Sequence, residues 1–183
     1  FVTLLLRQNG NYLEQLFAPL IVVDTPWAAE LRAIMRDGGI ARHAYHAYAN
    51  YAQNKWQEWR KDALAGAGPL AGAGPLAGAG RIKPLLYAYR VSLTGIHLLR
   101  TGEVVADLPA LAPLYGLEHL LDLIAAKSAE HIAVPLEVGE HDRTLIRLQA
   151  ELEAAYAAST LPDAPTNYAA LDDFVLRVRA ACA

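Results

Sequence analysis

The chain has 183 residues, of which 54% are hydrophobic and 19% charged, and its formal net charge is −3. This composition excludes a wholly disordered chain, and the length suffices for one domain with a substantial core. The slightly negative charge argues against broad binding to a nucleic-acid duplex, which usually requires a strong basic excess, but it is compatible with a local basic pocket. We therefore expect any polyanionic partner to be small or gripped locally.

The single cysteine, Cys182, has no second cysteine with which to form an internal disulfide, and this fits a reducing compartment. No apolar run reaches the roughly 18 residues that cross a bilayer, and the apolar start lacks the basic region of a signal peptide. We therefore expect a soluble cytoplasmic protein with no membrane partner. Because the sequence opens on Phe1 in what reads as a helix, we also expect it to be a piece of a longer protein.

The first elements expected along the chain are a short apolar helix and two strands. The helix is FVTLLLRQN at 1–9. The strands are YLEQLF at 12–17 and LIVVD at 20–24, the only sheet material that the sequence indicates. In the first strand Glu14 alternates onto the face opposite its apolar neighbours, where a carboxylate could enter a site.

Helices separated by a repeat are expected next. Thr25 and Pro26 form an N-cap followed by a proline in the first turn, and a longer helix is expected from about Ile40 to Leu64. Residues 64–81 contain the unit LAGAG three times. We interpret the repeat as a linker between two helical blocks, because it has neither glycine-rich phosphate signature and its prolines remove amide donors.

The remaining elements are also expected to be helices. One is predicted over Lys83–Thr101 and ends at Gly102, and a connection interrupted by prolines follows it. Leucines at helical spacing predict amphipathic helices within 117–130, 141–159 and 167–183.

The helix predicted over Lys83–Thr101 is apolar on most sides and carries one narrow polar seam. At 100° per residue its polar members fall within about 40° of one line, which Lys83 joins approximately. Cationic groups on one buried seam repel each other and are costly to desolvate unless an anion lies between them. We therefore interpret the seam as the lining of an anion site; the alternative is a row of core polar groups, each satisfied within the protein. The seam consists of Lys83, Tyr87, Arg90, Thr94 and His97.

A second set of polar side chains recurs on the helix predicted over 40–64. His43, His46 and Asn50 follow one another at steps of three to four residues. The two histidines could offer metal ligands, but no carboxylate or cysteine stands at a matching position. We therefore interpret the set as a candidate additional pocket whose members form hydrogen bonds.

Three blocks of the sequence resemble a known family. They are NGNYLEQLFAPLIV at 9–22, HAYHAYANYAQNK at 43–55 and KPLLYAYRVSLTGIHLLRTGEVVADLPAL at 83–111. Together they are similar to the later two thirds of the predicted nucleotidyltransferases of the DNA polymerase beta superfamily, a group that includes RNA-ligase-associated forms. The similarity covers roughly 1–127 without the repeat. It implies a mainly α fold, in which a helical bundle is attached to a small remnant of a mixed α/β nucleotidyltransferase sheet.

The resemblance also suggests a division of the chain into four parts. These are the end of a palm-like sheet at 1–24, a helical segment at 25–63, the LAGAG linker at 64–81 and a C-terminal helical domain at 82–183.

For activity, the resemblance implies transfer of a nucleotidyl group from a nucleoside triphosphate to an acceptor, with Mg²⁺ as cofactor. On this analogy Glu14 is the candidate catalytic residue and metal ligand. The acceptor is not identified by the residues, and RNA is one candidate. The superfamily's Gly-Ser turn and Asp-x-Asp strand are absent from the 183 residues, so the chain alone is not expected to catalyse the reaction. The candidate nucleotide- and phosphate-binding residues are Lys83, Tyr87, Arg90, His97 and Arg100.

Two alternatives stay open. Arg90 and His97 have the R-x₆-H spacing that is similar to the motif of the HEPN ribonucleases, in which paired subunits cleave RNA without a metal. The other alternative is a non-catalytic helical module that binds a nucleotide. Metal-free RNA cleavage would favour the first alternative, and ligand binding without turnover would favour the second.

Overall fold

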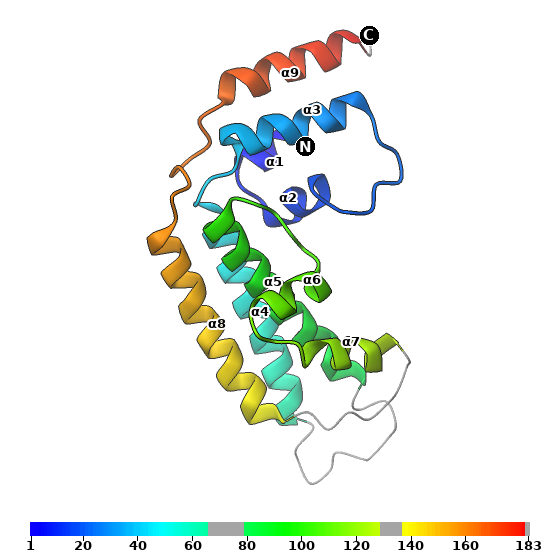
Figure 1. Ribbon diagram of the computed structural model, residues 1–183, viewed down its shortest axis with the longest axis vertical. Coiled ribbons are helices and arrows are strands. Elements are labelled where there is room, and N and C mark those ends of the chain that lie inside the picture. The colour runs from blue at the N-terminus through cyan, green and yellow to red at the C-terminus, as the bar shows by residue number, and fades with distance from the viewer. Residues whose placement is uncertain (66–78, 129–136, 182–183) are drawn as a thin grey trace.

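The computed structural model describes residues 1–65, 79–128 and 137–181, and within them every regular element is helical (Figure 1). The prediction of a mainly α fold is thereby confirmed. The elements are α1 (Val2–Leu6), α2 (Gly10–Leu16), α3 (Pro26–Ile34), the π-helix η1 (Met35–Gly39), α4 (Ala44–Ala65), α5 (Ala79–Thr101), α6 (Leu108–Leu114), α7 (Leu120–Ser128), α8 (Val138–Ala158) and α9 (Tyr168–Ala181).

The long helices α4, α5 and α8 pack against one another and form the centre of the molecule (Figure 1). Leu93 and Ile96 of α5 are fully buried, as are Trp59 of α4 and Leu152 of α8. Because α5 also contacts α6 and α7, it is covered on most sides. This burial explains why its sequence is apolar nearly all the way round.

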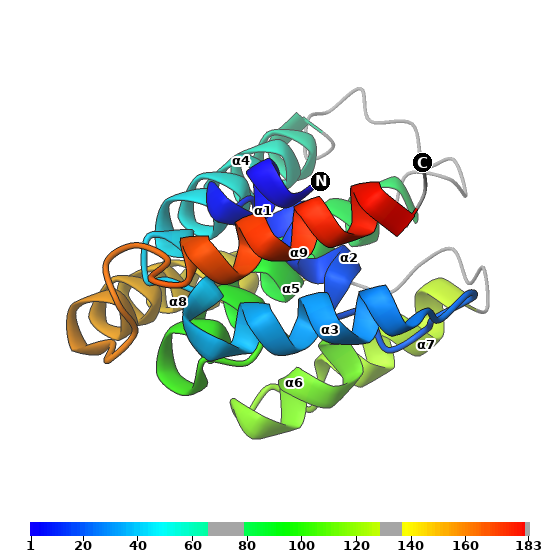
Figure 2. The same ribbon diagram turned by 90° about the horizontal axis from the view of Figure 1, so that it is seen from above.

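The short helices α1, α2 and α3 lie with α9 across one end of the long helices (Figures 1 and 2). A buried glutamine joins this layer to the start of α4. Gln8 donates hydrogen bonds to the carbonyl oxygens of Leu5 at 3.0 Å and Gly39 at 2.8 Å, and its own Oε1 accepts from the Ala41 amide at 2.8 Å. Every polar atom of this buried side chain is therefore satisfied.

The strand predicted over 12–17 is wrong, because these residues belong to α2 and the turn after it. Asn9 caps the helix by accepting from the Asn11 amide at 3.1 Å. Leu13 and Leu16, three residues apart, are both buried, which is the spacing of a helical face. Glu14 thus stands on a helix.

The strand predicted over 20–24 is also wrong, since the structure gives this segment no regular element. Its apolar side chains point largely into solvent: Leu20 is 81% exposed, Val22 89% and Val23 75%. A strand needs a neighbour for its backbone groups, and the described part of the chain contains none. The expected sheet remnant is therefore missing from the described residues.

The predicted helices after Thr25 are confirmed, with shifted ends. The helix expected from Lys83 begins at Ala79 and continues through Pro84, so Lys83 does not lie at its N-terminus. Residues 66–78 of the LAGAG repeat lie outside the described residues.

The proline-interrupted connection after Gly102 contains a helix that was not predicted, α6. Its Pro109 stands in the first turn, where a missing amide hydrogen costs nothing.

A single hydrophobic core joins residues from three of the four predicted parts. Leu13, Trp59 and Leu93, which come from 1–24, 25–63 and 82–183, belong to the same buried cluster. The boundaries of the four parts stay a prediction.

None of the helices in the described ranges combines the length and the apolar character that crossing a membrane requires.

A buried histidine lies where α8 packs on the other two long helices. His141 is 7% exposed, and its Nδ1 lies 2.9 Å from the hydroxyl oxygen of Tyr89 on α5. The rings of Trp59 and His119 each lie 6.2 Å from its ring. Burial, and after it the neighbouring His119, lower the pKa of His141 from its ordinary value of 6.5, while Glu140 opposes this.

We expect this histidine to make stability depend on pH. The pKa of His141 is lower in the folded than in the unfolded protein, so the unfolded state binds the proton more readily. The contribution of His141 to the free energy of unfolding is therefore fully present above pH 6.5 and is lost as the pH falls below that value. Thermal unfolding between pH 7.5 and 5.5 should show the decline, and His141→Gln should flatten it. The control is His43→Gln, at an exposed histidine, which should show the same decline as the wild type. If stability declined as steeply in His141→Gln as in the wild type, the assignment to His141 would be contradicted.

Candidate functional site

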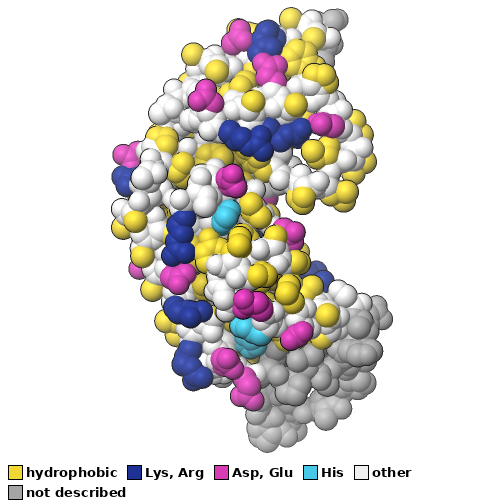
Figure 3. Space-filling model, in the orientation of Figure 1, with side chains coloured by type: hydrophobic (Ala, Val, Ile, Leu, Met, Phe, Trp, Pro, Cys, Tyr) yellow, Lys and Arg dark blue, Asp and Glu magenta, His cyan; other side chains and the backbone are white. Residues whose placement is uncertain are grey.

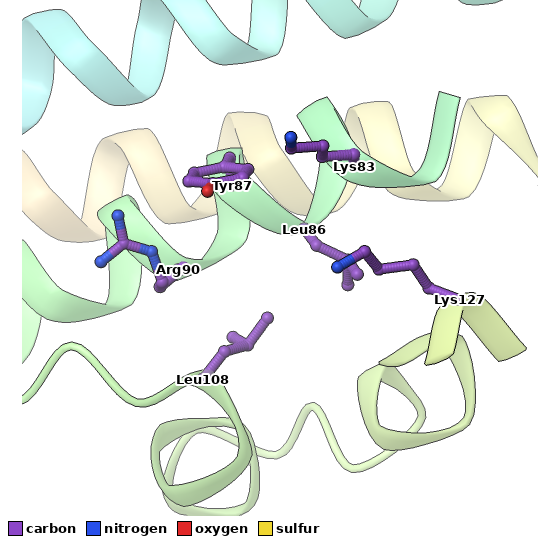
Figure 4. Close-up of a pocket in the computed structure, with 6 residues that line it drawn as sticks. All are labelled: Lys83, Leu86, Tyr87, Arg90, Leu108 and Lys127. Carbon is purple, nitrogen blue, oxygen red and sulfur yellow. The ribbon is translucent and has the colours of Figure 1, made fainter. Parts of the chain in front are cut away.

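A pocket of about 200 Å³ lies between α5 and the pair α6 and α7 (Figure 4). Leu86 and Leu108 give it apolar walls from α5 and α6, and the other lining residues are polar or charged. We call this the cation pocket. It is lined by Lys83, Leu86, Tyr87, Arg90, Leu108 and Lys127.

The cations of this pocket come from two elements. Lys83 and Arg90 stand two turns apart on α5 with Tyr87 between them, and Lys127 reaches from α7 towards α5, its amino group beside Leu86 (Figure 4). Within the described ranges, neither lysine has a carboxylate at ion-pair distance. The pocket therefore carries two lysine charges that no described acidic side chain compensates.

Arg90 has both a carboxylate partner and the pocket beside it. Its Nη1 donates to Glu14 Oε2 at 2.6 Å, and the side chains are only 21% and 15% exposed. Its guanidinium carbon also lies 5.4 Å from the centre of the Tyr87 ring. The ion pair links α2 to α5, and its arginine lines the cation pocket.

The five predicted phosphate-binding residues of α5 divide into two groups. Lys83, Tyr87 and Arg90 line the cation pocket, whereas His97 and Arg100 lie near Tyr115 instead. The His97 Nδ1 is 3.3 Å from the Tyr115 hydroxyl, and Arg100 lies 5.6 Å from the centre of that ring.

Arg100 also has an acidic neighbour, because its Nη2 lies 3.8 Å from an oxygen of Glu151. Thr94, between the two groups, is fully buried and its hydroxyl has no described partner. The structure thus brings together three of the five predicted phosphate-binding residues, and it places the other two elsewhere on the helix.

A second pocket, of about 150 Å³, lies between α2 and α4 and includes Glu14, the partner of Arg90. Tyr48 is 2% exposed, and Tyr51 stands one turn further along α4. Burial, and after it the Glu14 carboxylate, raise the pKa of Tyr48, so its hydroxyl stays protonated. We call this the tyrosine pocket; it is lined by Asn9, Gly10, Asn11, Glu14, Ala47, Tyr48 and Tyr51.

His43, His46 and Asn50 are exposed and line neither the cation pocket nor the tyrosine pocket, and the additional pocket expected at them stays a prediction. The rings of the two histidines lie 4.8 Å apart, and the ring of His46 lies 5.9 Å from that of Tyr156 on α8. The two histidines thus form part of a surface cluster of rings.

Glu14 was the candidate magnesium ligand. Its Oε2 is held by Arg90, and in the ranges that the structure covers no three residues among His, Cys, Asp and Glu could hold a metal ion together. Two-metal chemistry needs several carboxylates, so the described residues do not by themselves fit Mg²⁺. The role of Glu14 as a metal ligand stays a prediction.

Sequence reasoning did not identify Lys127 or Tyr48 as site residues. Lys127 ends an ordinary amphipathic helix, and only the packing of α7 beside α5 brings it to the cation pocket. Tyr48 lies in a run of alanines and tyrosines, which by itself reads as core. Tyr48 is distinguished by its burial against Gly10 and Gly95 of two other helices. This contact is visible only in the tertiary structure.

Fold and pockets together define a mainly helical protein with cations gathered around one pocket. The chain matches the family RlaP, the RNA repair pathway DNA polymerase beta family, over residues 1–177, and it belongs to that family. The predicted resemblance to the DNA polymerase beta superfamily is confirmed. No curated protein and no solved structure matches the chain.

Proposed function

We propose that the protein serves nucleotidyl transfer from a nucleoside triphosphate, and that its cation pocket binds the phosphates. Membership of the RNA repair pathway DNA polymerase beta family supports the class of reaction. The observation that carries the assignment to this pocket is that Lys127 on α7 lines it together with Lys83 and Arg90 on α5. RNA is the acceptor that the family description suggests.

An anion is the ligand that these charges favour. Two lysines and an arginine around about 200 Å³ repel one another, and a bound phosphate would replace that repulsion by charge-assisted hydrogen bonds. Tyr87, with its hydroxyl beside Arg90, could donate one more. A phosphate would also compete with Glu14 for Arg90, because both offer anionic oxygens to the same guanidinium.

In such a reaction, the chain's own residues bind and orient the triphosphate. Lys83, Arg90 and Lys127 would neutralise charge on the departing pyrophosphate, which is the term that dominates catalysis of phosphoryl and nucleotidyl transfer. Magnesium would supply further charge neutralisation when bound. We assign it no ligands among the described residues.

The ribonuclease alternative has no contact in its favour. Arg90 pairs with Glu14 and His97 with Tyr115, so the two residues of the R-x₆-H spacing have different partners. It stays a prediction that metal-free RNA cleavage would test.

The proposal predicts that Lys127→Gln weakens binding of a nucleoside triphosphate by about fivefold, because one charge-assisted contact worth about 1 kcal/mol is lost. Titration calorimetry at several salt concentrations would measure it, and the salt dependence should become shallower. The matched control is Lys61→Gln, an exposed lysine of α4 that lines neither pocket. Equal affinities for the two variants would show that the cation pocket does not take the phosphates.

A further inference from the structure

The tyrosine pocket and the cation pocket are linked by the Arg90–Glu14 ion pair. Arg90 lines the cation pocket, and Glu14 lines the tyrosine pocket, with 2.6 Å between their paired atoms. Each pocket is thus lined by one member of the same ion pair, so the two pockets are neighbours.

Two glycines fix the position of Tyr48 between the helices. A Cβ on Gly95 of α5 would lie 2.8 Å from the Tyr48 Cβ, and a Cβ on Gly10 of α2 would lie 3.3 Å from the ring carbon that carries the hydroxyl. Backbone therefore contacts the residue at both ends. The hydroxyl is held at the α2 side, where the tyrosine pocket lies.

This hydroxyl is a buried polar group without a partner. Tyr48 is 2% exposed, and its oxygen has no hydrogen bond within the part of the chain that the structure describes. Leaving a buried hydroxyl unpaired costs about 1–3 kcal/mol, so phenylalanine would suit the same place better if packing were the only requirement. The tyrosine therefore points to a ligand group that supplies the missing hydrogen bond.

The other lining groups restrict what that ligand can be. The Glu14 carboxylate accepts hydrogen bonds and repels anions, so a phosphate is disfavoured here. Asn9 and Asn11 offer amides, and the Tyr51 ring, 37% exposed, offers a flat apolar face. This set suits a neutral group with several hydroxyl or amino hydrogens.

The volume of the tyrosine pocket also limits the size of the group that it can bind. Complete small-molecule sites occupy about 300–1,000 Å³. At about 150 Å³, this pocket holds one ring system or one sugar.

We propose that the tyrosine pocket binds the nucleoside part of the nucleotide whose phosphates bind in the cation pocket. The position of the phosphates rests on the proposed function, whereas the assignment of the nucleoside to the tyrosine pocket rests on the residues of that pocket. Tyr48 and Glu14 receive the hydroxyl or amino groups of the nucleoside, and Tyr51 covers its flat face. Beside this flat face, the Lys55 amino group lies 5.7 Å from the centre of the Tyr51 ring.

The test compares nucleoside triphosphates with tripolyphosphate, which has the phosphates alone, by titration calorimetry on the full chain in Mg²⁺-free buffer. The wild type should bind the best nucleoside triphosphate at least about tenfold more tightly than tripolyphosphate. Tyr48→Phe should weaken the triphosphate about three- to tenfold, as expected for one hydrogen bond, and leave tripolyphosphate unchanged. Its thermal stability should be unchanged or higher, because the orphaned hydroxyl is removed.

Two comparisons sharpen the test. Tyr168→Phe is the matched control, because this tyrosine is 49% exposed on α9. The hydrogen bond of Tyr48 can come from the sugar or from the base, and triphosphates with 2′- or 3′-deoxy sugars and with each of the four bases distinguish the two. If Tyr48→Phe no longer weakens binding of a deoxynucleotide, the hydrogen bond is made by the missing sugar hydroxyl. An effect that depends on the base assigns it to the base edge.

The outcomes separate this inference from the phosphate proposal. If tripolyphosphate binds as tightly as every triphosphate, or if Tyr48→Phe changes no affinity, the tyrosine pocket is not the nucleoside site. If tripolyphosphate does not bind but free nucleosides do, and Tyr48→Phe weakens them, then the nucleoside site stands and the phosphate proposal fails.

Discussion

Arg90→Ala is expected to weaken binding of a nucleoside triphosphate at least about tenfold, or about 1.4 kcal/mol, because it removes the arginine from the cation pocket. It should also lower the free energy of unfolding by about 1–3 kcal/mol, because Glu14 is then left mostly buried without its partner. This loss is smaller than the roughly 3–5 kcal/mol of a fully buried pair, since both side chains keep some exposure. Titration calorimetry and denaturant unfolding would measure the two effects.

A double-mutant cycle with Glu14→Gln separates these effects. The pair Arg90→Ala and Glu14→Gln should recover most of the stability, because no charge is left unpaired, but it should not recover the affinity. Glu14→Gln alone should bind tripolyphosphate more tightly than the wild type, since Arg90 is released from its carboxylate partner. Arg60→Ala, at a 55% exposed arginine 3.6 Å from Asp142, is the matched control and should change neither quantity much.

The result that would contradict this view is a large loss of stability with unchanged affinity in Arg90→Ala. Arg90 would then have only a structural role, in joining α2 to α5. Weaker binding of tripolyphosphate by Glu14→Gln would likewise contradict the competition between Glu14 and phosphate for Arg90.

Gly95→Ala is expected to destabilise the protein by about 2 kcal/mol, although alanine is the better helix former. The added methyl would lie 2.8 Å from the Tyr48 Cβ and 2.9 Å from a methyl of Leu152, where α4, α5 and α8 cross. The leucine methyl can move, but the Tyr48 Cβ is tied to the α4 backbone. Relief therefore requires the helices to separate, which costs more than the gain of up to about 1 kcal/mol in helix propensity.

Gly139→Ala is the matched control for this change. It stands in the first turn of α8, and among the residues that the structure describes its added methyl would meet Arg143 Nη1 alone, at 3.7 Å. It should stabilise the protein by about 0.5–1 kcal/mol through helix propensity. Denaturant unfolding of both variants checks the sign, and a Gly95→Ala variant as stable as Gly139→Ala would show that the crossing can expand without cost.

The sequence predicted the α-helices from Thr25 onward, with the exception of α6, because their signals are local. N-caps, prolines in first turns and leucines three to four residues apart act within one or two turns, so they survive whatever the rest of the chain does. The same local geometry places Lys83, Tyr87 and Arg90 on one face of α5. Family membership was also visible in the three sequence blocks.

The two strand predictions were wrong for a physical reason. In YLEQLF, Leu13 and Phe17 are four residues apart, a spacing that places them on one face of a strand or of a helix, so this short segment fits either element. LIVVD has the composition of a buried strand, but a strand also needs partners, and the described chain provides none. Strand formation depends on neighbours that a single segment does not contain.

The sequence by itself determined the mainly α fold and the cationic face of α5. Tertiary structure alone decided that Glu14 pairs with Arg90, that Lys127 joins the cation pocket, and that His97 and Arg100 turn to Tyr115. Helical periodicity fixes which side chains share a face within one element. Contacts between elements depend on how connections and apolar faces arrange whole helices in space, and no local pattern encodes those distances.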